Sequence, residues 1–102
     1  MTNTTTAVKT RVEHELKEPG LFKVIYMNDD ATTMEFVVES LMAVFGHTQE
    51  ISEHITMEIH EKGSSIVAVL PFELAEQKGL EVTNMARNQG YPLKIVIEAD
   101  QP

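Results

Sequence analysis

The chain has 102 residues, 42% of them hydrophobic and 24% charged, which predicts one globular domain with a modest core. The formal net charge of −8 argues against nucleic acid and anionic membranes as partners, because both attract clustered Lys and Arg. Cysteine is absent and no apolar run reaches the roughly 18 residues of a membrane span, so we expect a cytoplasmic protein, with nothing that demands more than a monomer.

The N-terminal stretch differs in composition from the rest. Residues 1–20 are polar, their Lys and Arg side chains balance their Glu side chains, and they end at Pro19-Gly20. We expect a flexible extension here, which is either a solvated leader or an arm that engages a partner. Residues 21–102 form the predicted core domain and carry the whole net charge, which favours cationic ligands.

The first strand and helix are clearly marked. β-Branched and aromatic residues over 22–27 predict a strand that ends in a polar turn. Thr32 is the expected N-cap of the following helix, and Glu35 three residues later completes a capping box. Apolar residues then recur at helical spacing up to Gly46 and predict one core face: Met34, Val37, Val38, Leu41, Met42 and Phe45.

The remaining elements alternate. A second helix is expected from Thr48 or Gln49 to Lys62, with Ile51, Ile55 and Ile59 as its apolar stripe. A strand over 64–70, a helix over 72–89 with small residues at helical spacing, and a strand over 93–98 complete the order. We predict a single α+β domain, β-α-α-β-α-β, with a three-stranded antiparallel sheet covered on one face by three helices.

Two groups of polar residues are candidate ligand contacts. Asn28, Asp29 and Asp30 lie on the strand-to-helix turn and offer acceptors to a ligand with donors or positive charge. The alternative is ordinary turn chemistry, which these residue types favour. His60 shares a helix face with Thr56; its alternative role is a cation in the last turn of a helix.

The sequence argues against catalysis and cofactors. Asp29, Asp30 and His60 could in principle meet around a metal, but no histidine pair has helical i, i+4 spacing and no His-Glu-x-x-His motif occurs. No Gly-x-Ser-x-Gly turn or glycine-rich phosphate loop is present either. We therefore expect no catalytic residue, no metal and no cofactor.

The stretch from Lys23 to Val37, Lys-Val-Ile-x-x-Asn-Asp-Asp-x-Thr-x-Met-Glu-Phe-Val, resembles the signature of the ClpS family. The resemblance extends over about residues 21–99 and includes His60, the segment from Glu73 to Lys78, Ala86-Arg87, and Tyr91-Pro92-Leu93. ClpS proteins are adaptors that deliver N-degron substrates to ClpA, the AAA+ unfoldase of the Clp protease. Their substrates begin with an unblocked Leu, Phe, Tyr or Trp.

The resemblance implies a role for each matching residue. Asn28, Asp29 and His60 would bind the substrate α-amino group, with Asp30 as a secondary acidic contact. The substrate side chain would enter a hydrophobic pocket in which Met34 excludes β-branched residues; its members are Thr32, Met34, Thr56, Ile59 and Leu93. The unfoldase would contact Glu73, Glu76 and Lys78.

Departures from the family and two rival functions remain. Thr56 stands where many relatives have Met or another large apolar residue, so the preference among Leu, Phe, Tyr and Trp is open, and Ala31 replaces the aromatic residue common after Asn-Asp-Asp. His60 must be unprotonated to accept a hydrogen bond, which predicts weaker binding below about pH 6. The rivals are a small enzyme that uses Asp29, Asp30 and His60 as acid and base, and a protein-interaction domain of similar fold with another partner.

Overall fold

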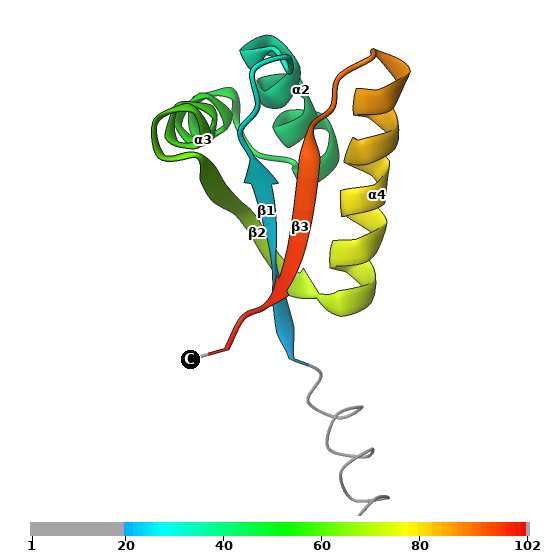
Figure 1. Ribbon diagram of the computed structural model, residues 1–102. Coiled ribbons are helices and arrows are strands. Elements are labelled where there is room, and N and C mark those ends of the chain that lie inside the picture. The colour runs from blue at the N-terminus through cyan, green and yellow to red at the C-terminus, as the bar shows by residue number, and fades with distance from the viewer. Residues whose placement is uncertain (1–19, 102) are drawn as a thin grey trace, which may run out of the picture.

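The computed structural model describes residues 20–101 and confirms the predicted order of elements (Figure 1). The extension that we predicted to be flexible spans residues 1–20, and residues 1–19 of it lie outside the described range. The elements are β1 (Leu21–Met27), α2 (Met34–Phe45), α3 (Gln49–Lys62), β2 (Ser64–Pro71), α4 (Phe72–Asn88) and β3 (Lys94–Ala99).

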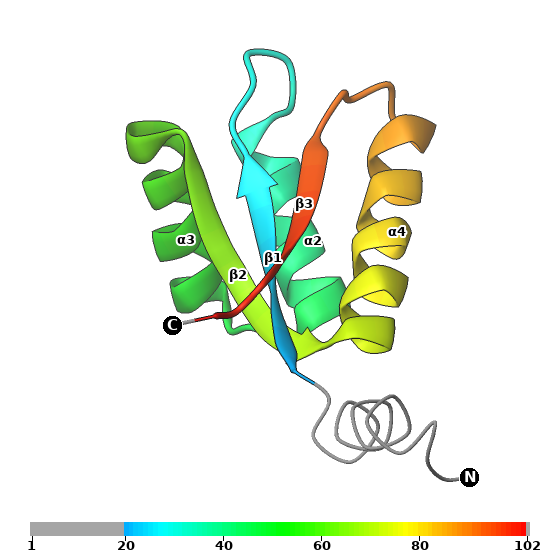
Figure 2. The same cartoon turned by 60° about the horizontal axis from the view of Figure 1, so that its bottom comes forward.

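The sheet is three-stranded and antiparallel, in the order β2-β1-β3, as predicted. Figures 1 and 2 show α2, α3 and α4 together on one face of it. Alternation along the central strand explains this arrangement: Val24 and Tyr26 are fully buried toward the helices, while Lys23 and Ile25 point to the other face.

The predicted core face of α2 is wrong in part. The residues of α2 buried in the structure are Phe36, Val37, Ser40, Leu41 and Val44. Met34 and Met42, which we expected in the core, are 39% and 40% exposed. Apolar residues cover so much of this helix that periodicity fits two neighbouring stripes, and only contacts with α3, α4 and the sheet decide which one is buried.

The stripe on α3 needs a similar correction. Ile55 and Ile59 are buried as expected, but Ile51 is 48% exposed and Ser52 is buried in its place. The buried residues Ser52, Ile55, Thr56 and Ile59 share one face of α3, and Ile51 lies at the edge of that face. The predicted helix ends are confirmed: Gly46 and Gly63 close α2 and α3 with φ of 72° and 95°, values that favour glycine.

Small residues let α4 lie close to the sheet, as their spacing predicted. Ala75, Gly79, Val82 and Ala86 are its buried residues. A Cβ atom built at Gly79 would lie 3.4 Å from side-chain atoms of Ile95 and Ile97 on β3. That separation is ordinary van der Waals contact, so this position has room for a methyl group and little more.

The two ends of the domain carry different features. The loop after β1, the end of α3 and the segment before β3 lie at the end of the molecule shown at the top of Figure 1. At the opposite end, β1 begins and α4 starts directly after β2. Residues predicted to bind substrate and residues predicted to bind the unfoldase are therefore well separated.

Candidate functional site

The loop between β1 and α2 is held together by the carboxylate of Asp29. Its Oδ1 accepts hydrogen bonds from the backbone N–H groups of Ala31 and Thr32 at 2.8 and 2.7 Å. Its Oδ2 accepts from the hydroxyl of Thr32 at 2.8 Å. Three donors on one carboxylate fix the course of the loop, so Asp29 is an organising residue as well as a source of negative charge.

These bonds correct the predicted helix cap. Thr32 is committed to Asp29, and the N-cap is Thr33, whose side chain accepts a hydrogen bond from Phe36 N at 3.1 Å. Glu35 is therefore only two residues beyond the cap, and the predicted capping box does not form. The sequence has two threonines in a row, and the hydrogen bonds of the loop decide which of them caps the helix.

The pKa of Asp29 reflects the same contacts. Partial desolvation raises it, but the hydrogen bonds from Thr32 and Ala31, together with the charge of Arg87, lower it further, and the net shift is downward. A carboxyl whose pKa is lower in the folded state stabilises the fold at a pH above its unfolded pKa. This contribution is complete above about pH 4 and is lost as the pH falls through the folded value.

We expect Asp29→Ala to lower the free energy of unfolding by about 1–2 kcal/mol at pH 7, because three donors of the loop lose the carboxylate that accepts from them. Amide hydrogen exchange at Ala31 and Thr32 should also become faster. Asp30→Ala is the matched control, since Asp30 is exposed and makes no side-chain hydrogen bond to the other described residues. Equal stability of the two variants at neutral pH would contradict this role for Asp29.

Asn28 is fixed beside the end of α3. Its backbone N–H donates to Gly63 O at 2.9 Å, which places the end of β1 next to the last turn of α3, where His60 lies. Asn28 and His60 are both exposed. Among the described residues, neither the Asn28 amide nor the His60 ring is engaged in a side-chain hydrogen bond, so both are available to a ligand.

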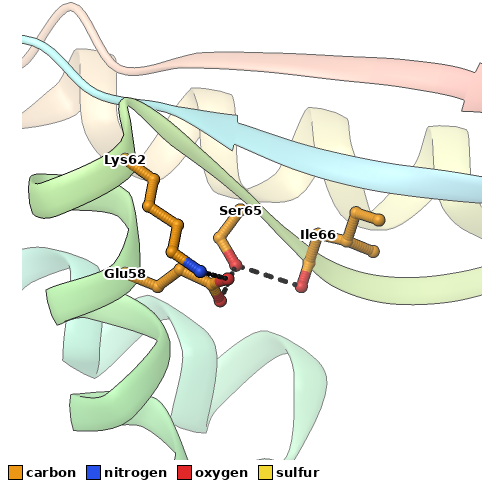
Figure 3. A network of polar contacts seen from close by, with 4 residues as sticks. All are labelled: Glu58, Lys62, Ser65 and Ile66. Carbon is orange, nitrogen blue, oxygen red and sulfur yellow. Dashed lines mark hydrogen bonds and ion pairs between the residues drawn. The ribbon is translucent and has the colours of Figure 1, made fainter.

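A polar network on the other side of this turn ties α3 to β2. Figure 3 shows Glu58 Oε1 accepting from the hydroxyl of Ser65 at 2.8 Å, and Glu58 Oε2 pairing with Lys62 Nζ at 3.4 Å. The Ser65 hydroxyl and Lys62 together lower the pKa of Glu58, outweighing desolvation. The contacts join the last turn of α3 to the first residues of β2, and so help to orient the turn that carries His60.

The predicted site residues meet around one pocket of about 240 Å³. All nine residues predicted to bind substrate line it: Asn28, Asp29, Asp30, Thr32, Met34, Thr56, Ile59, His60 and Leu93. Leu93 comes from the segment just before β3 and is almost completely buried. Met27 and Val37 also line the pocket and were missed, because their apolar side chains read from sequence as strand and core.

The pocket is polar at its mouth and apolar at depth. Ile59 and Leu93 are almost completely buried, while Met34 is exposed at the rim. Acidic and amide oxygens from the loop and the ring of His60 surround the opening. This arrangement suits a ligand with an apolar side chain on one side and a positively charged, donor-rich group on the other.

Contacts from α4 hold Leu93 in place. The guanidinium of Arg87 donates to the carbonyl oxygens of Tyr91 and Leu93, each at 2.9 Å. The ring of Tyr91 packs on Phe36 of α2, with centroids 5.2 Å apart. Arg87 is therefore a positioning residue, and its charge also helps to lower the pKa of Asp29. Sequence alone gave no signal for this role.

A second polar link lies beneath the pocket. The hydroxyls of Tyr26 and Ser40 are hydrogen-bonded at 2.7 Å, and Ser40 donates to Val37 O at 2.9 Å. Burial raises the pKa of Tyr26 well above its usual range, although the bond to Ser40 works in the opposite direction. Tyr26 therefore stays neutral, and the bonds connect β1 to the turn of α2 that carries Val37.

Thr56 presents little polarity to the pocket. Its hydroxyl donates to Ser52 O one turn earlier at 2.7 Å, within α3. Since its one proton is used in this way, the group needs no ligand partner. The wall that Thr56 forms is consequently short and mostly apolar.

The residues predicted to contact the unfoldase lie on α4. Glu73 and Glu76 are exposed in its first part. Lys78 is half-buried, and its Nζ donates to Val44 O at 2.9 Å near the end of α2. A cation suits this position because the last carbonyl groups of a helix carry partial negative charge. Lys78 thus has a structural role that the sequence did not reveal.

Two further features concern metal binding and membrane spans. Within residues 20–101, no group of three His, Cys, Asp or Glu side chains is arranged to hold a metal ion. No helix in the described part of the chain is both long and apolar enough to cross a membrane.

Comparisons with known proteins identify the family of the chain. Residues 17–96 match the family described as ATP-dependent Clp protease adaptor protein ClpS. The chain is 38% identical to the ClpS adapter protein of Helicobacter hepaticus, over 91% of this chain and 94% of that protein. It is 44% identical to the ClpS adapter protein of Nitratidesulfovibrio vulgaris, over 85% of this chain and 87% of that protein.

A solved structure gives the same result. Agrobacterium tumefaciens ClpS2 bound to L-phenylalaninamide is similar with a TM-score of 0.78 and 36% sequence identity, over 80% of this chain and 99% of that one. These matches make the chain an adaptor and not an enzyme, which removes the acid–base alternative. It belongs to the ClpS family.

Proposed function

We propose that this protein recognises substrates with Leu, Phe, Tyr or Trp at an unblocked N-terminus and delivers them to a ClpA-type AAA+ unfoldase in the cytoplasm, acting as a monomer. The observation that carries the proposal is that Asn28 and His60 line the same pocket as the buried apolar residues Ile59 and Leu93. The side chains of Asn28 and His60 make no hydrogen bond to the other described residues. L-phenylalaninamide, which Agrobacterium tumefaciens ClpS2 binds, is a single residue with an unblocked α-amino group and so supports this ligand class.

The mouth of the pocket matches an α-ammonium group. The group offers three donors and one positive charge, and the Asn28 amide oxygen and an unprotonated His60 nitrogen accept from it. Asp29 sets the loop geometry and, with the exposed Asp30, contributes negative charge at the mouth. Acetylation removes the charge and two of the donors, so an acetylated terminus should be rejected.

The apolar part of the pocket accepts the first side chain. Burying a Leu or Phe side chain contributes about 1.5–3 kcal/mol. Met34 lies at the rim, next to the point where the side chain enters, which suits a wall that excludes branching at Cβ. Thr32 and Thr56 complete the walls of the pocket on the α2 and α3 sides.

The function is tested by fluorescence anisotropy with labelled peptides that differ only in the first residue. Peptides that begin with Leu, Phe, Tyr or Trp should bind tightly, whereas Val-first and N-acetyl-Leu peptides should bind at least tenfold more weakly. Asn28→Ala should weaken the tight binders. Binding that ignores the first residue and its acetylation would overturn the proposal in favour of a protein-interaction domain with another partner.

Delivery to the unfoldase is proposed to use the first half of α4. Its exposed residues combine charge and apolar surface, from Glu73 and Glu76 to Phe72 and Leu74, and they lie at the opposite end of the domain from the pocket. This separation would let a substrate and the unfoldase bind at the same time. Lys78 would act mainly by holding α4 against α2.

We expect Glu73→Lys to weaken binding to the isolated N-terminal domain of a ClpA-type unfoldase about fivefold or more, because reversing a charge replaces attraction with repulsion. Affinity for a Leu-first peptide should not change. Glu81→Lys, an exposed position two turns later on α4, is the charge-matched control. Equal losses in the two variants, measured by titration calorimetry, would argue against this assignment.

A further inference from the structure

A second depression, which we call the α2–α3 groove, lies beside the pocket. It is open to solvent and measures about 660 Å³. Its lining comes from the first turns of α3 and from the outer face of α2: Met34, Glu35, Val38, Glu39, Met42, Ala43, Gln49 and Glu53. Its floor is formed by three apolar residues of α2 that were predicted to face the core. They are Met34, Val38 and Met42, which recur at i, i+4 and i+8 and so share one face of the helix.

The groove continues from the pocket. Met34 lines both of them, so an extended chain that leaves the pocket past Met34 can enter the groove directly. From Met34 to Ala43 the groove follows nine residue steps of α2, roughly 14 Å at 1.5 Å per residue. An extended polypeptide covers that distance with about four residues at roughly 3.3 Å each.

The rim of the groove is acidic. Glu35, Glu39 and Glu53 line it, and none of the residues 20–101 that line it is a Lys or Arg. The ion pairs among the described residues, Lys23–Glu98 and Lys62–Glu58, do not include these three carboxylates. Within the same part of the chain, the side-chain hydrogen-bond partner of Glu53 is the neutral Gln49 amide, which donates to it at 3.1 Å. An apolar floor between uncompensated carboxylates favours an occupant with apolar and basic side chains.

We propose that the α2–α3 groove is a second subsite that binds the third to sixth residues of the same substrate chain and prefers basic and apolar side chains there. This inference rests on the proposed function, because the first residue must occupy the pocket. Continuity through Met34 and the length of the groove favour the substrate chain over an unfoldase or a second copy of the protein. The groove thereby adds sequence selectivity beyond the N-terminal residue.

The test compares three labelled peptides that all begin with Leu-Ser. Their next four residues are Lys-Leu-Lys-Leu, Ser-Gly-Ser-Gly or Glu-Ser-Glu-Ser. The first should bind about tenfold more tightly than the second, and the third more weakly than both. The gain is the logarithm of the ratio between the affinities of the first and second peptides. Met42→Ser and Glu39→Lys should each reduce this gain by at least half. Neither should alter affinity for the Ser-Gly peptide.

Matched controls separate the groove from general surface effects. Leu80→Ser removes an exposed apolar side chain on α4, and Glu81→Lys makes the same charge change at a distance from the groove. Both should keep the full gain. Equal effects of Glu39→Lys and Glu81→Lys would show a long-range charge effect only and would overturn the subsite.

Failure of the subsite and failure of the proposed function give different results. If the function fails, no Leu-first peptide binds in an acetylation-sensitive way. If only the subsite fails, all three peptides bind with equal, acetylation-sensitive affinity, or the gain persists in Met42→Ser and Glu39→Lys. A change in unfoldase binding or oligomeric state in these two variants, with peptide selectivity intact, would assign the groove to another occupant and also overturn the proposal.

Discussion

His60→Ala is expected to lower affinity for a Leu-first peptide roughly ten- to hundredfold, since a hydrogen bond to a charged group contributes about 1.5–3 kcal/mol. The ring lies exposed at the mouth of the pocket, so its removal should leave the free energy of unfolding almost unchanged. His54→Ala is the matched control, because His54 is exposed on the same helix but does not line the pocket. Anisotropy titrations and thermal melts measure the two effects.

The pH dependence of binding provides a sharper test of the same residue. A ring with protons on both nitrogens only donates and cannot accept from an ammonium group, so wild-type affinity should fall as the pH is lowered. His60→Ala should bind with little change between pH 5 and pH 7, whereas His54→Ala should keep the wild-type profile. An unchanged profile in His60→Ala would show that His60 is not the acceptor.

Thr56→Met is expected to change which first residue binds best. The longer side chain would occupy part of a pocket of about 240 Å³, and overpacking of a filled site costs roughly 1 kcal/mol or more. A Trp-first peptide should lose more affinity than a Leu-first peptide, so the ratio of the Trp-first affinity to the Leu-first affinity should fall about fivefold. Competition titrations with Trp-first and Leu-first peptides measure this ratio directly.

The control for this substitution is Thr56→Val, which keeps the volume and removes the hydroxyl. Because that hydroxyl donates to Ser52 O within α3, its loss should not affect the ligand, and the ratio should stay at its wild-type value. A ratio that changes in Thr56→Val but not in Thr56→Met would mean that polarity, rather than space, sets the preference.

Much of the site was predictable because its motifs are local. Asn28, Asp29 and Asp30 follow a strand and precede a helix, and this order alone puts them on a turn. Their meeting with His60, Ile59 and Leu93 could be inferred only through the family resemblance, since these residues lie far apart in the chain. Arg87 could not be identified, because its hydrogen bonds to Tyr91 O and Leu93 O depend on the turn that ends α4.

By itself, the sequence determined the order of the elements, their ends at Gly46 and Gly63, and the polar turn after β1. These features depend on interactions within a few residues, such as caps, turns and periodicity. Only the tertiary structure decided which stripe of α2 is buried, since two stripes were apolar enough and contact with α3, α4 and the sheet selects one. It likewise decided that Lys78 binds Val44 O at the end of α2, because residues 34 positions apart come together only when the chain is folded. The cap of α2 is a local choice between two neighbouring threonines, made by the Asp29 carboxylate, which binds Thr32 and leaves Thr33 to cap the helix.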